Sequence, residues 1–330
     1  MNPKRILVVG DAMLDRYWDG AVDRLSRDSL APVLRVTRRV DRPGGAANVA
    51  ANLAALGAAA TLLAPVGRDA AADTLAALLR EAGVAFERVD DDPAYATTEK
   101  IRCVSRDGHL LRADVEMPLP EAMRPAIAAR FGALLASHDI VVMSDHANGA
   151  LGGCAALVDA ARAAGRPVLV DPRGGDWARY AGALLVKPDR AELDAVLGER
   201  VDDAHLPARV AALRRGLDWR HLLVTQGEGG MTLHGDDGVS HWPAQVRDLS
   251  EVRDVNGAGD TVMAALAWRI GEGDDVAAAL RWANCAAGLA VREFGTATVA
   301  RSDLERAMAC ADGDAAIVRA AAESSEVGTA

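Results

Sequence analysis

The stretch DVNGAGDT, residues 254–261, decides the fold predicted for this chain of 330 residues. It places two glycines and a carboxylate directly before an apolar run, 262–270, that predicts a helix. The Gly-Ala-Gly turn lets the backbone approach a ligand closely, and the helix start offers unpaired N–H groups to an anion. Asp260 lies at that helix start, where the helix macrodipole favours its negative charge.

This arrangement is typical of phosphoryl transfer. The amides of Gly257, Ala258 and Gly259, which we call the anion cradle, would stabilise a moving phosphoryl group. Asp260 is the predicted catalytic base, which would accept the proton of a hydroxyl. Asp254 is predicted to order the loop or to contribute to a cation site. A Gly-rich loop with an aspartate as helix N-cap explains the same residues without any chemistry.

A second segment, GGAAN at residues 44–48, follows an extended stretch and opens another apolar helix. Asn48 and Asn52 lie one turn apart on the same face of that helix. Because a buried amide without a partner is costly, both are predicted to face a ligand. A glycine helix start with a solvated asparagine stripe is the plainer alternative. The two segments, about 210 residues apart, are stronger support together than either is alone.

Short apolar runs alternate with Ala-rich helical segments along most of the chain. This alternation predicts an α/β fold with a mainly parallel central sheet and helices on both faces. Two stretches, 33–40 and 97–114, show strand-like alternation, and no helix interrupts the second of them. They predict antiparallel strands outside the main sheet. The strands of the main sheet are predicted at 6–9, 60–65, 140–143, 167–170, 183–186 and 221–225, and helices near 44–56, 69–82, 150–164, 189–197 and 257–270.

Composition restricts the classes of partner. The hydrophobic content of 50% supplies a core, and a net charge of −10 argues against binding to nucleic acid or an anionic membrane. A phosphate-bearing substrate would therefore need a local basic pocket. The four cysteines are scattered, which indicates reduced, mostly buried residues. Polar residues, Gly57 and Pro65 break the apolar stretch 46–66, and no signal peptide is evident, so a soluble cytoplasmic protein is expected.

The order Gly-Gly-x-x-Asn and then Asp-x-x-Gly-Ala-Gly-Asp resembles the ribokinase-like (PfkB) family of carbohydrate kinases. Three further segments resemble the heptose 7-phosphate kinases within that family: GDAMLDRYW at 10–18, RPGGAANVA at 42–50 and DPRG at 171–174. The resemblance covers about residues 6–309. It implies a single kinase domain over 1–320, with a small antiparallel β lid contributed by about 16–42 and 95–116, and a flexible tail at 321–330.

The resemblance also implies an activity. It is ATP-dependent phosphorylation of the anomeric hydroxyl of D-glycero-β-D-manno-heptose 7-phosphate to the 1,7-bisphosphate, in ADP-heptose synthesis for lipopolysaccharide core. Mg²⁺ is the expected cofactor, and a monovalent cation is a further candidate. Lid strands of the family often pair between subunits, so a homodimer through the lid is expected. Because no His-x-x-His signature is present, a separate adenylyltransferase is expected to act in the same pathway.

Other functions stay open. Another ribokinase-like kinase, of a sugar phosphate or a nucleoside, would share the same motifs, and a non-catalytic sugar-phosphate-binding protein would share the fold. A dinucleotide-binding oxidoreductase would need Gly-x-Gly-x-x-Gly after the first strand, but Gly10 is followed by Asp11 and Ala12. A P-loop kinase is excluded, because the chain lacks Gly-x₄-Gly-Lys-Ser/Thr.

Candidate substrate-binding residues lie mainly at the carboxyl edge of the predicted sheet, where open α/β sheets bind ligands. Asp145 is preferred to His146 for a sugar or phosphate contact, since a lone loop histidine is more often a surface residue. Lys100 and Lys187 are two of only three lysines, and a basic lid cluster is predicted to hold the substrate's existing phosphate. The predicted substrate-binding residues are Asp11, Asp15, Gly44, Gly45, Asn48, Lys100, Arg102, Arg106, Arg112, Asp145 and Lys187.

Candidate ATP-binding residues lie in the second half of the chain. The segment 187–192 resembles the family's Asn-x-x-Glu motif, with Asp189 in place of the asparagine. The resemblance implies that Glu192 reaches Mg²⁺ through water. The segment 225–230 resembles the nucleotide-ribose loop of the family. The predicted ATP-binding residues are Asp189, Glu192, Thr225, Gly227, Gly257 and Gly259.

Overall fold

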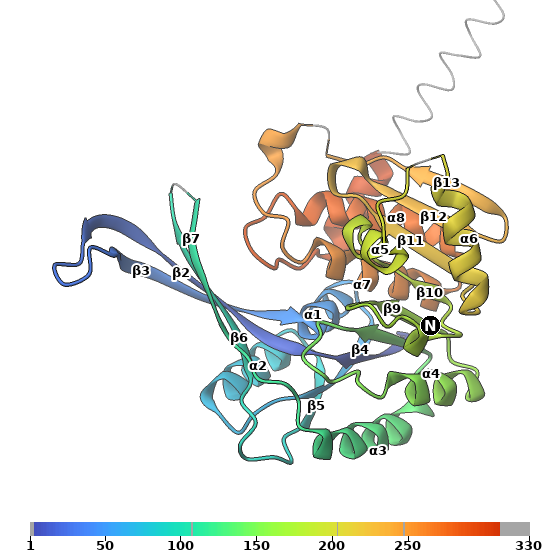
Figure 1. Ribbon diagram of the computed structural model, residues 1–330, viewed down its shortest axis with the longest axis horizontal. Coiled ribbons are helices and arrows are strands. Elements are labelled where there is room, and N and C mark those ends of the chain that lie inside the picture. Colours follow the sequence, from blue (N-terminus) through green and yellow to red (C-terminus); the bar gives the residue numbers. More distant parts are fainter. Residues whose placement is uncertain (1–2, 107, 203, 247, 311–330) are drawn as a thin grey trace, which may run out of the picture.

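The computed structural model describes residues 3–106, 108–202, 204–246 and 248–310 (Figure 1). The tail predicted at 321–330 and the end of the predicted domain, 311–320, lie outside the described residues. Within the described ranges, no helix is long and apolar enough to cross a bilayer.

A nine-stranded sheet forms the centre of the body, in the order β13-β12-β11-β10-β9-β8-β1-β4-β5. Neighbouring strands from β11 to β5 pair in parallel, while β12 and β13 pair antiparallel at one edge, so the prediction of a mainly parallel sheet is confirmed. The strands are β1 (Arg5–Gly10), β4 (Ala59–Pro65), β5 (Ala85–Val89), β8 (Ile140–Ser144), β9 (Val168–Asp171), β10 (Leu185–Val186), β11 (His221–Thr225), β12 (Met231–Gly235) and β13 (Gly238–Trp242).

Helices cover both faces of this sheet, as predicted. Ile6 and Val8 of β1 pack into one core, while Leu7 and Val9 pack into the other, as the two-residue period of a strand requires. The first core lies under α1 (Ala46–Ala55), α2 (Ala70–Glu81), α7 (Ala258–Glu272) and α8 (Val276–Ala290), and the second under α3 (Arg124–Leu135), α4 (Cys154–Ala163), α5 (Arg190–Leu197) and α6 (Leu206–Gly216). Short 3₁₀ turns are η1 (Glu121–Met123), η2 (Ala178–Tyr180), η3 (Gly227–Gly229) and η4 (Leu249–Glu251), and residues 301–310 are helical.

A second sheet projects from the body as the predicted lid (Figure 1). Its strands are β2 (Ala12–Leu25), β3 (Pro32–Gly45), β6 (Thr98–Ser105) and β7 (Gly108–Val115), in the order β3-β2-β6-β7. The outer pairs are antiparallel as predicted, but β2 and β6 run parallel, which corrects the prediction of a wholly antiparallel lid. Each of these two strands enters the lid from the body, so they run in the same direction.

The sheet order reverses at β1, which lies between β8 and β4. Ligands of open α/β sheets bind at such a point, outside the carboxyl ends of the strands. Gly10 ends β1 against the neighbouring strand, because a Cβ at this position would lie 1.9 Å from the Ser144 carbonyl oxygen. This close contact places Asp11 beside Asp145, where the predicted site residues begin.

Candidate active site

The two glycine motifs meet through a buried hydrogen bond between α1 and α7. Asn48 Nδ2 donates to Asp260 Oδ2 at 2.8 Å, across 212 residues of sequence. Both side chains are buried, and Asn52 in turn donates to Asn48 Oδ1 at 3.1 Å. Burial raises the pKa of Asp260 to about 6, although nearby His146 and the bond from Asn48 lower it. A carboxylate of this kind is suited to accept a proton near neutral pH.

The anion cradle lies directly beside this carboxylate. Gly257 precedes α7 with φ of 79°, and a Cβ there would lie 2.7 Å from Asn48 Nδ2. Glycine is therefore required both by the backbone conformation and by the contact with Asn48. The Ala258 amide already donates to the Val255 carbonyl at 3.3 Å. The Gly259 amide lies in the first turn of α7, where backbone amides have no partner within the helix, so this part of the cradle can bind a ligand.

A buried ammonium group adds positive charge to the cradle. Lys187 follows β10, is 3% exposed, and lies with Nζ 3.1 Å from Asp171 Oδ1. A Cβ on Gly259 would lie 3.3 Å from the same Nζ. Lys187 therefore lies where an anion bound at the start of α7 would meet both the helix dipole and a cation.

Asp254 orders the loop that leads into α7, which is one of the two roles expected for it. Its Oδ1 accepts the Asn256 amide and its Oδ2 accepts the Gly295 amide, both at 3.0 Å. The carboxylate thereby ties the loop before the cradle to a segment 41 residues further along the chain.

Asp11 is committed to the loop that follows β8. Its carboxylate accepts the backbone amides of His146 at 2.9 Å, Asn148 at 3.1 Å and Ala150 at 2.9 Å. Burial raises the pKa of Asp11, and the bond from Ala150 opposes that shift. Asp11 thus shapes the edge of the site, and its contact with a sugar stays a prediction.

Asp15 lies on β2 and binds a lid arginine. Arg102 Nη1 donates to Asp15 Oδ1 at 2.5 Å, and its guanidinium lies 5.4 Å from the Tyr17 ring centroid. Burial raises the pKa of Asp15, and the charge of Arg102 opposes it. A Cβ on Gly44 would lie 2.6 Å from Asp15 Oδ2, while one on Gly45 would lie 2.6 Å from the Asp11 carbonyl oxygen. The two glycines therefore let β3 pack closely against both aspartates.

The loop after β8 gives Asp145 and His146 different surroundings. Asp145 Oδ2 accepts bonds from Arg179 Nη2 and the Tyr180 hydroxyl, each at 2.7 Å. His146 instead lies close enough to Asp260 and Asp15 for its charge to lower both pKa values. The preference for Asp145 as a sugar or phosphate contact stays a prediction.

Asp189 and Glu192 form a capping box at the start of α5. Asp189 Oδ1 accepts the Glu192 amide at 2.7 Å, and Glu192 Oε2 accepts the Asp189 amide at 2.9 Å. Glu192 also binds Arg173 at 2.5 Å, and burial raises the pKa of Glu192. No group of three metal-ligating side chains occurs in the part of the chain that the structure describes. Contact of Glu192 with Mg²⁺ through water stays a prediction.

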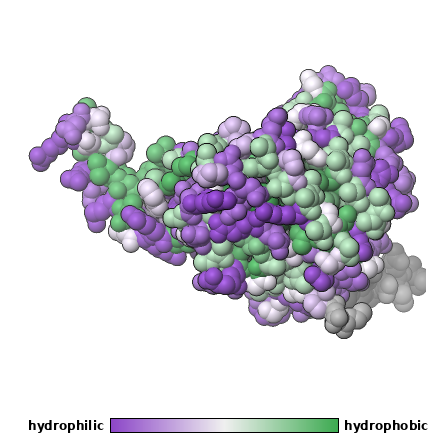
Figure 2. Space-filling view, turned by 90° about the horizontal axis from the view of Figure 1, so that it is seen from below, coloured by the Kyte–Doolittle hydropathy of each residue, from purple (hydrophilic) through white to green (hydrophobic). Residues whose placement is uncertain are grey.

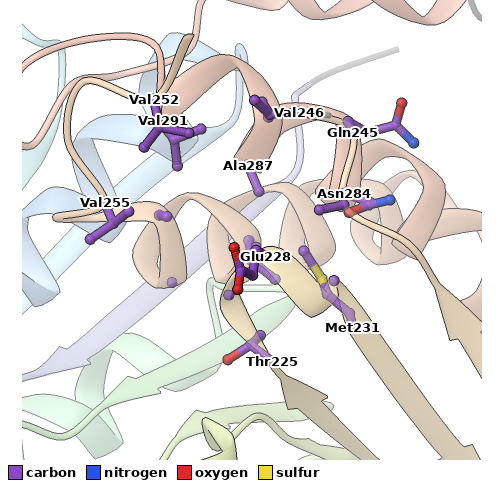
Figure 3. Close-up of a pocket in the computed structure, with 17 residues that line it drawn as sticks. Thr225, Glu228, Met231, Gln245, Val246, Val252, Val255, Asn284, Ala287 and Val291 are labelled. Carbon is purple, nitrogen blue, oxygen red and sulfur yellow. The ribbon is translucent and has the colours of Figure 1, made fainter. Parts of the chain in front are cut away.

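An apolar cavity of about 430 Å³ opens beside the cradle (Figure 3). Thr225, Gly227 and Gly259 border it, and α7, α8 and the β11–β12 turn form its walls. Its size and mainly hydrophobic lining fit a flat heteroaromatic group. Other residues that line it are Met231, Val246, Val252, Val255, Val262, Asn284, Ala287 and Val291.

A second cavity, of about 710 Å³, lies between the lid and the body, and we call it the lid cavity. Arg38, Arg42 and Arg106 line it from the lid, and Arg253 lines it from the body. Four guanidinium groups around one space favour an anion. Asp19 and Glu293 also border the cavity, so its net charge stays positive.

The four residues of the predicted basic lid cluster do not all lie at the lid cavity. Lys100 binds Asp114 at 2.8 Å and also binds Glu116, while Arg112 binds Asp114 at 2.9 Å. Arg102 is held by Asp15, as described above. Of the four predicted residues, Arg106 lines the lid cavity. Arg38, Arg42 and Arg253 were not singled out from the sequence.

Comparison with known proteins places this site in a family. The model of the pfkB family of carbohydrate kinases matches residues 3–303. The chain is 47% identical over 307 residues to the bifunctional protein HldE of Halorhodospira halophila, covering 92% of this chain and 63% of that protein. It therefore spans less than two thirds of such relatives. It is also 46% identical over 300 residues to the D-beta-D-heptose 7-phosphate kinase of Bordetella bronchiseptica, covering 91% of this chain and 95% of that protein.

Solved structures share the fold at low sequence identity. Phosphofructokinase-2 from Escherichia coli, in complex with substrates and products, aligns with a TM-score of 0.76 at 20% identity, covering 93% of this chain and 98% of that one. Ribokinase from Arabidopsis thaliana, complexed with ribose and ATP, aligns with a TM-score of 0.72 at 21% identity, covering 93% and 99%. With the family model matching nearly the whole chain, this protein belongs to the PfkB family of carbohydrate kinases.

Proposed function

We propose that this chain is an ATP-dependent kinase of D-glycero-β-D-manno-heptose 7-phosphate, which phosphorylates the anomeric hydroxyl to give the 1,7-bisphosphate. The product would feed ADP-heptose synthesis for lipopolysaccharide core, in the cytoplasm. The observation that carries the proposal is the Asp260 carboxylate, buried and bonded to Asn48 at 2.8 Å beside the anion cradle. The heptose substrate is supported by the 46% identity to a relative named for that activity.

Proton transfer in this site would begin at Asp260. Its carboxylate accepts the proton of the anomeric hydroxyl, and the sugar oxygen then bonds to the γ-phosphorus of ATP as the bond to ADP breaks. The backbone of Gly257 and Gly259 and the Lys187 ammonium stabilise the negative charge on the transferred group. Asn48 holds the carboxylate in position and leaves Oδ1 of Asp260 for the hydroxyl. Catalysis is therefore positioning plus electrostatics, as phosphoryl transfer requires.

The nucleotide would occupy the apolar cavity, with its phosphates at the start of α7. Thr225 and Gly227 border the cavity on the side of the sheet, where the ribose would lie. Mg²⁺ bound with ATP would neutralise phosphate charge, and Glu192 would hold its water shell. A monovalent cation requirement remains a further proposal, with the Asp254 loop as the place to test it.

The sugar would lie between the lid and the carboxyl edge of the sheet. Asp15, held by Arg102, offers acceptor atoms for sugar hydroxyls, and His146 lies near both Asp15 and Asp260. The phosphate already present on the sugar would enter the lid cavity, which Arg106 lines from the lid and Arg253 lines from the body.

We further propose a homodimer joined through the lid. The outer strands of the lid are β3 and β7, and exposed strand edges need covering. Figure 2 shows hydrophobic side chains along the projecting arm. Leu25, Leu30 and Leu111 on the lid are 55%, 73% and 62% exposed. Apolar side chains of this size are typical of a protein interface when they gather on one projecting element.

The substrate assignment is tested by coupled ADP release with Mg-ATP. The panel is D-glycero-β-D-manno-heptose 7-phosphate, the unphosphorylated heptose, fructose 1-phosphate, fructose 6-phosphate and adenosine. Turnover is expected mainly with heptose 7-phosphate, and Asp260→Asn is expected to lower kcat by at least about 100-fold, because it removes the base. Thermal stabilisation by the sugar phosphate checks that the variant still folds and binds.

The other outcomes of that assay are distinct. Preferred turnover of another panel member would keep the kinase mechanism and overturn the heptose substrate. Thermal stabilisation of the wild type by sugar phosphate, without ADP release, would make this chain a non-catalytic binding protein.

The lid cavity is tested with Arg106→Ala and Arg253→Ala. Each loses one charge-assisted contact with the substrate phosphate, so KM for the sugar phosphate is expected to rise about 10- to 100-fold. KM for ATP is expected to stay within about twofold of wild type. Arg35→Ala is the matched control, because this lid arginine is 64% exposed and bound to Asp23. Equal effects in the control, or an unchanged sugar-phosphate KM in both variants, would contradict the assignment.

The homodimer is tested by sedimentation velocity at micromolar protein. Twice the mass of one chain is expected, and Leu30→Asp combined with Leu111→Asp is expected to shift the protein toward one chain mass, because it places charge in the interface. A wild-type protein that sediments as a single chain would exclude the lid dimer.

A further inference from the structure

Residues 291–299 connect α8 to the helical residues 301–310, and we call them the connecting segment. This segment contacts the loop before α7 and the second turn of α1. The Gly295 amide donates to Asp254 Oδ2 at 3.0 Å, and the Val299 amide donates to Asn52 Oδ1 at 3.2 Å. A Cβ on Gly257 would lie 3.2 Å from Thr296 Cγ2, so Thr296 packs directly against the anion cradle. The geometry of the cradle therefore depends on the connecting segment.

The same segment also contacts three strands of the lid. The Phe294 ring lies 5.3 Å from the Tyr17 ring of β2, edge to face at 65°, and 6.5 Å from the His109 ring of β7, stacked at 21°. At the base of β3, Arg42 Nη1 donates to the Thr296 carbonyl and Thr296 Oγ1 donates to the Pro43 carbonyl, both at 3.2 Å. Lid and cradle thus share one short piece of backbone.

Phe294 does not belong to the hydrophobic core, so core packing does not account for its position between the lid and the body. Its side chain is 41% exposed, and it lines the lid cavity together with Tyr17 and His109. The neighbouring Gly295 has φ of 74°, and a Cβ there would lie 3.0 Å from Tyr17 Cζ. The Tyr17 ring thus contacts both the bare backbone of Gly295 and the ring of Phe294. A shift of the lid would therefore be transmitted to Gly295 and hence to Asp254.

We propose that Phe294 is a positioning residue that couples closure of the lid to the geometry of the anion cradle. The proposal rests on the proposed function, because the ligand that closes the lid is the sugar phosphate. An anion in the lid cavity draws the lid arginines toward Arg253 and holds Tyr17 and His109 on Phe294. The connecting segment then holds Asp254 and Gly257 in place for the nucleotide phosphates. Each ligand thereby tightens the binding of the other, as linkage requires.

The test is calorimetric titration of a non-hydrolysable ATP analogue with Mg²⁺, without and with saturating heptose 7-phosphate. In the wild type, saturating sugar phosphate is expected to lower the Kd of the ATP analogue at least about fivefold, and we call this ratio the coupling factor. Fivefold is the lower end of ordinary coupling between two sites. Phe294→Ala is expected to bring this factor close to one, while the affinity for each ligand alone stays within about twofold. Phe294→Tyr keeps both ring contacts and is expected to restore the factor. Val239→Ala, at an exposed position on β13, is the control and is expected to retain it.

The contrary outcomes separate this inference from the proposed function. A wild type that binds both ligands with a factor near one overturns the coupling and leaves the kinase assignment intact. The role of Phe294 is also overturned if Phe294→Ala retains the wild-type coupling factor. It is likewise overturned if the variant loses affinity for the ATP analogue equally in the absence and in the presence of heptose 7-phosphate. No binding of heptose 7-phosphate to the wild type overturns the substrate assignment and the inference with it.

Discussion

The hydrogen bond from Asn48 to Asp260 is the interaction on which the rest of the site depends. A carboxylate that is 8% exposed needs a partner, and the amide of Asn48 supplies one at 2.8 Å. Because each residue lies in the first turn of its helix, the bond brings the glycine loops before α1 and α7 to the same edge of the sheet. Lid strand β3 ends at Gly45, directly before α1, so this contact also lies where the lid joins the body.

Positive charge is concentrated at the site, although the protein as a whole is negatively charged. The chain carries a net charge of −10, yet buried Lys187 and the arginines of the lid cavity concentrate positive charge where phosphates would bind. Carboxylates hold two of the basic groups near the site: Asp171 pairs with Lys187, and buried Asp15 pairs with Arg102 of the lid. The net charge of a protein influences which large partners it attracts, whereas the charged residues that line a cleft determine which small ligand binds there.

The sequence predicted the sheet, the lid and the two motifs, because strand periodicity and glycine turns are local signals. It did not single out α3, α6 and α8, and it missed the contacts that depend on pairing between strands. Lys100 faces Asp114 across β6 and β7, and this register decides that its charge is already neutralised. The commitment of Asp145 to Arg179 and the approach of His146 to Asp260 arise from loop packing. Phe294 gave no local signal, since its partners lie on two lid strands.

The most direct test of the account is the pH dependence of kcat/KM in the wild type and in Asn48→Ala. Asp260 acts as a base when deprotonated, so activity is expected above its pKa of about 6 and is lost as the pH falls through that value. The bond from Asn48 lowers this pKa, so its removal is expected to move the acid limb to higher pH. Substrate phosphates also titrate near pH 6, at about the same place, but the mutation leaves them unchanged. An acid limb that stays in place in Asn48→Ala, or that lies near pH 4 in the wild type, would contradict the account.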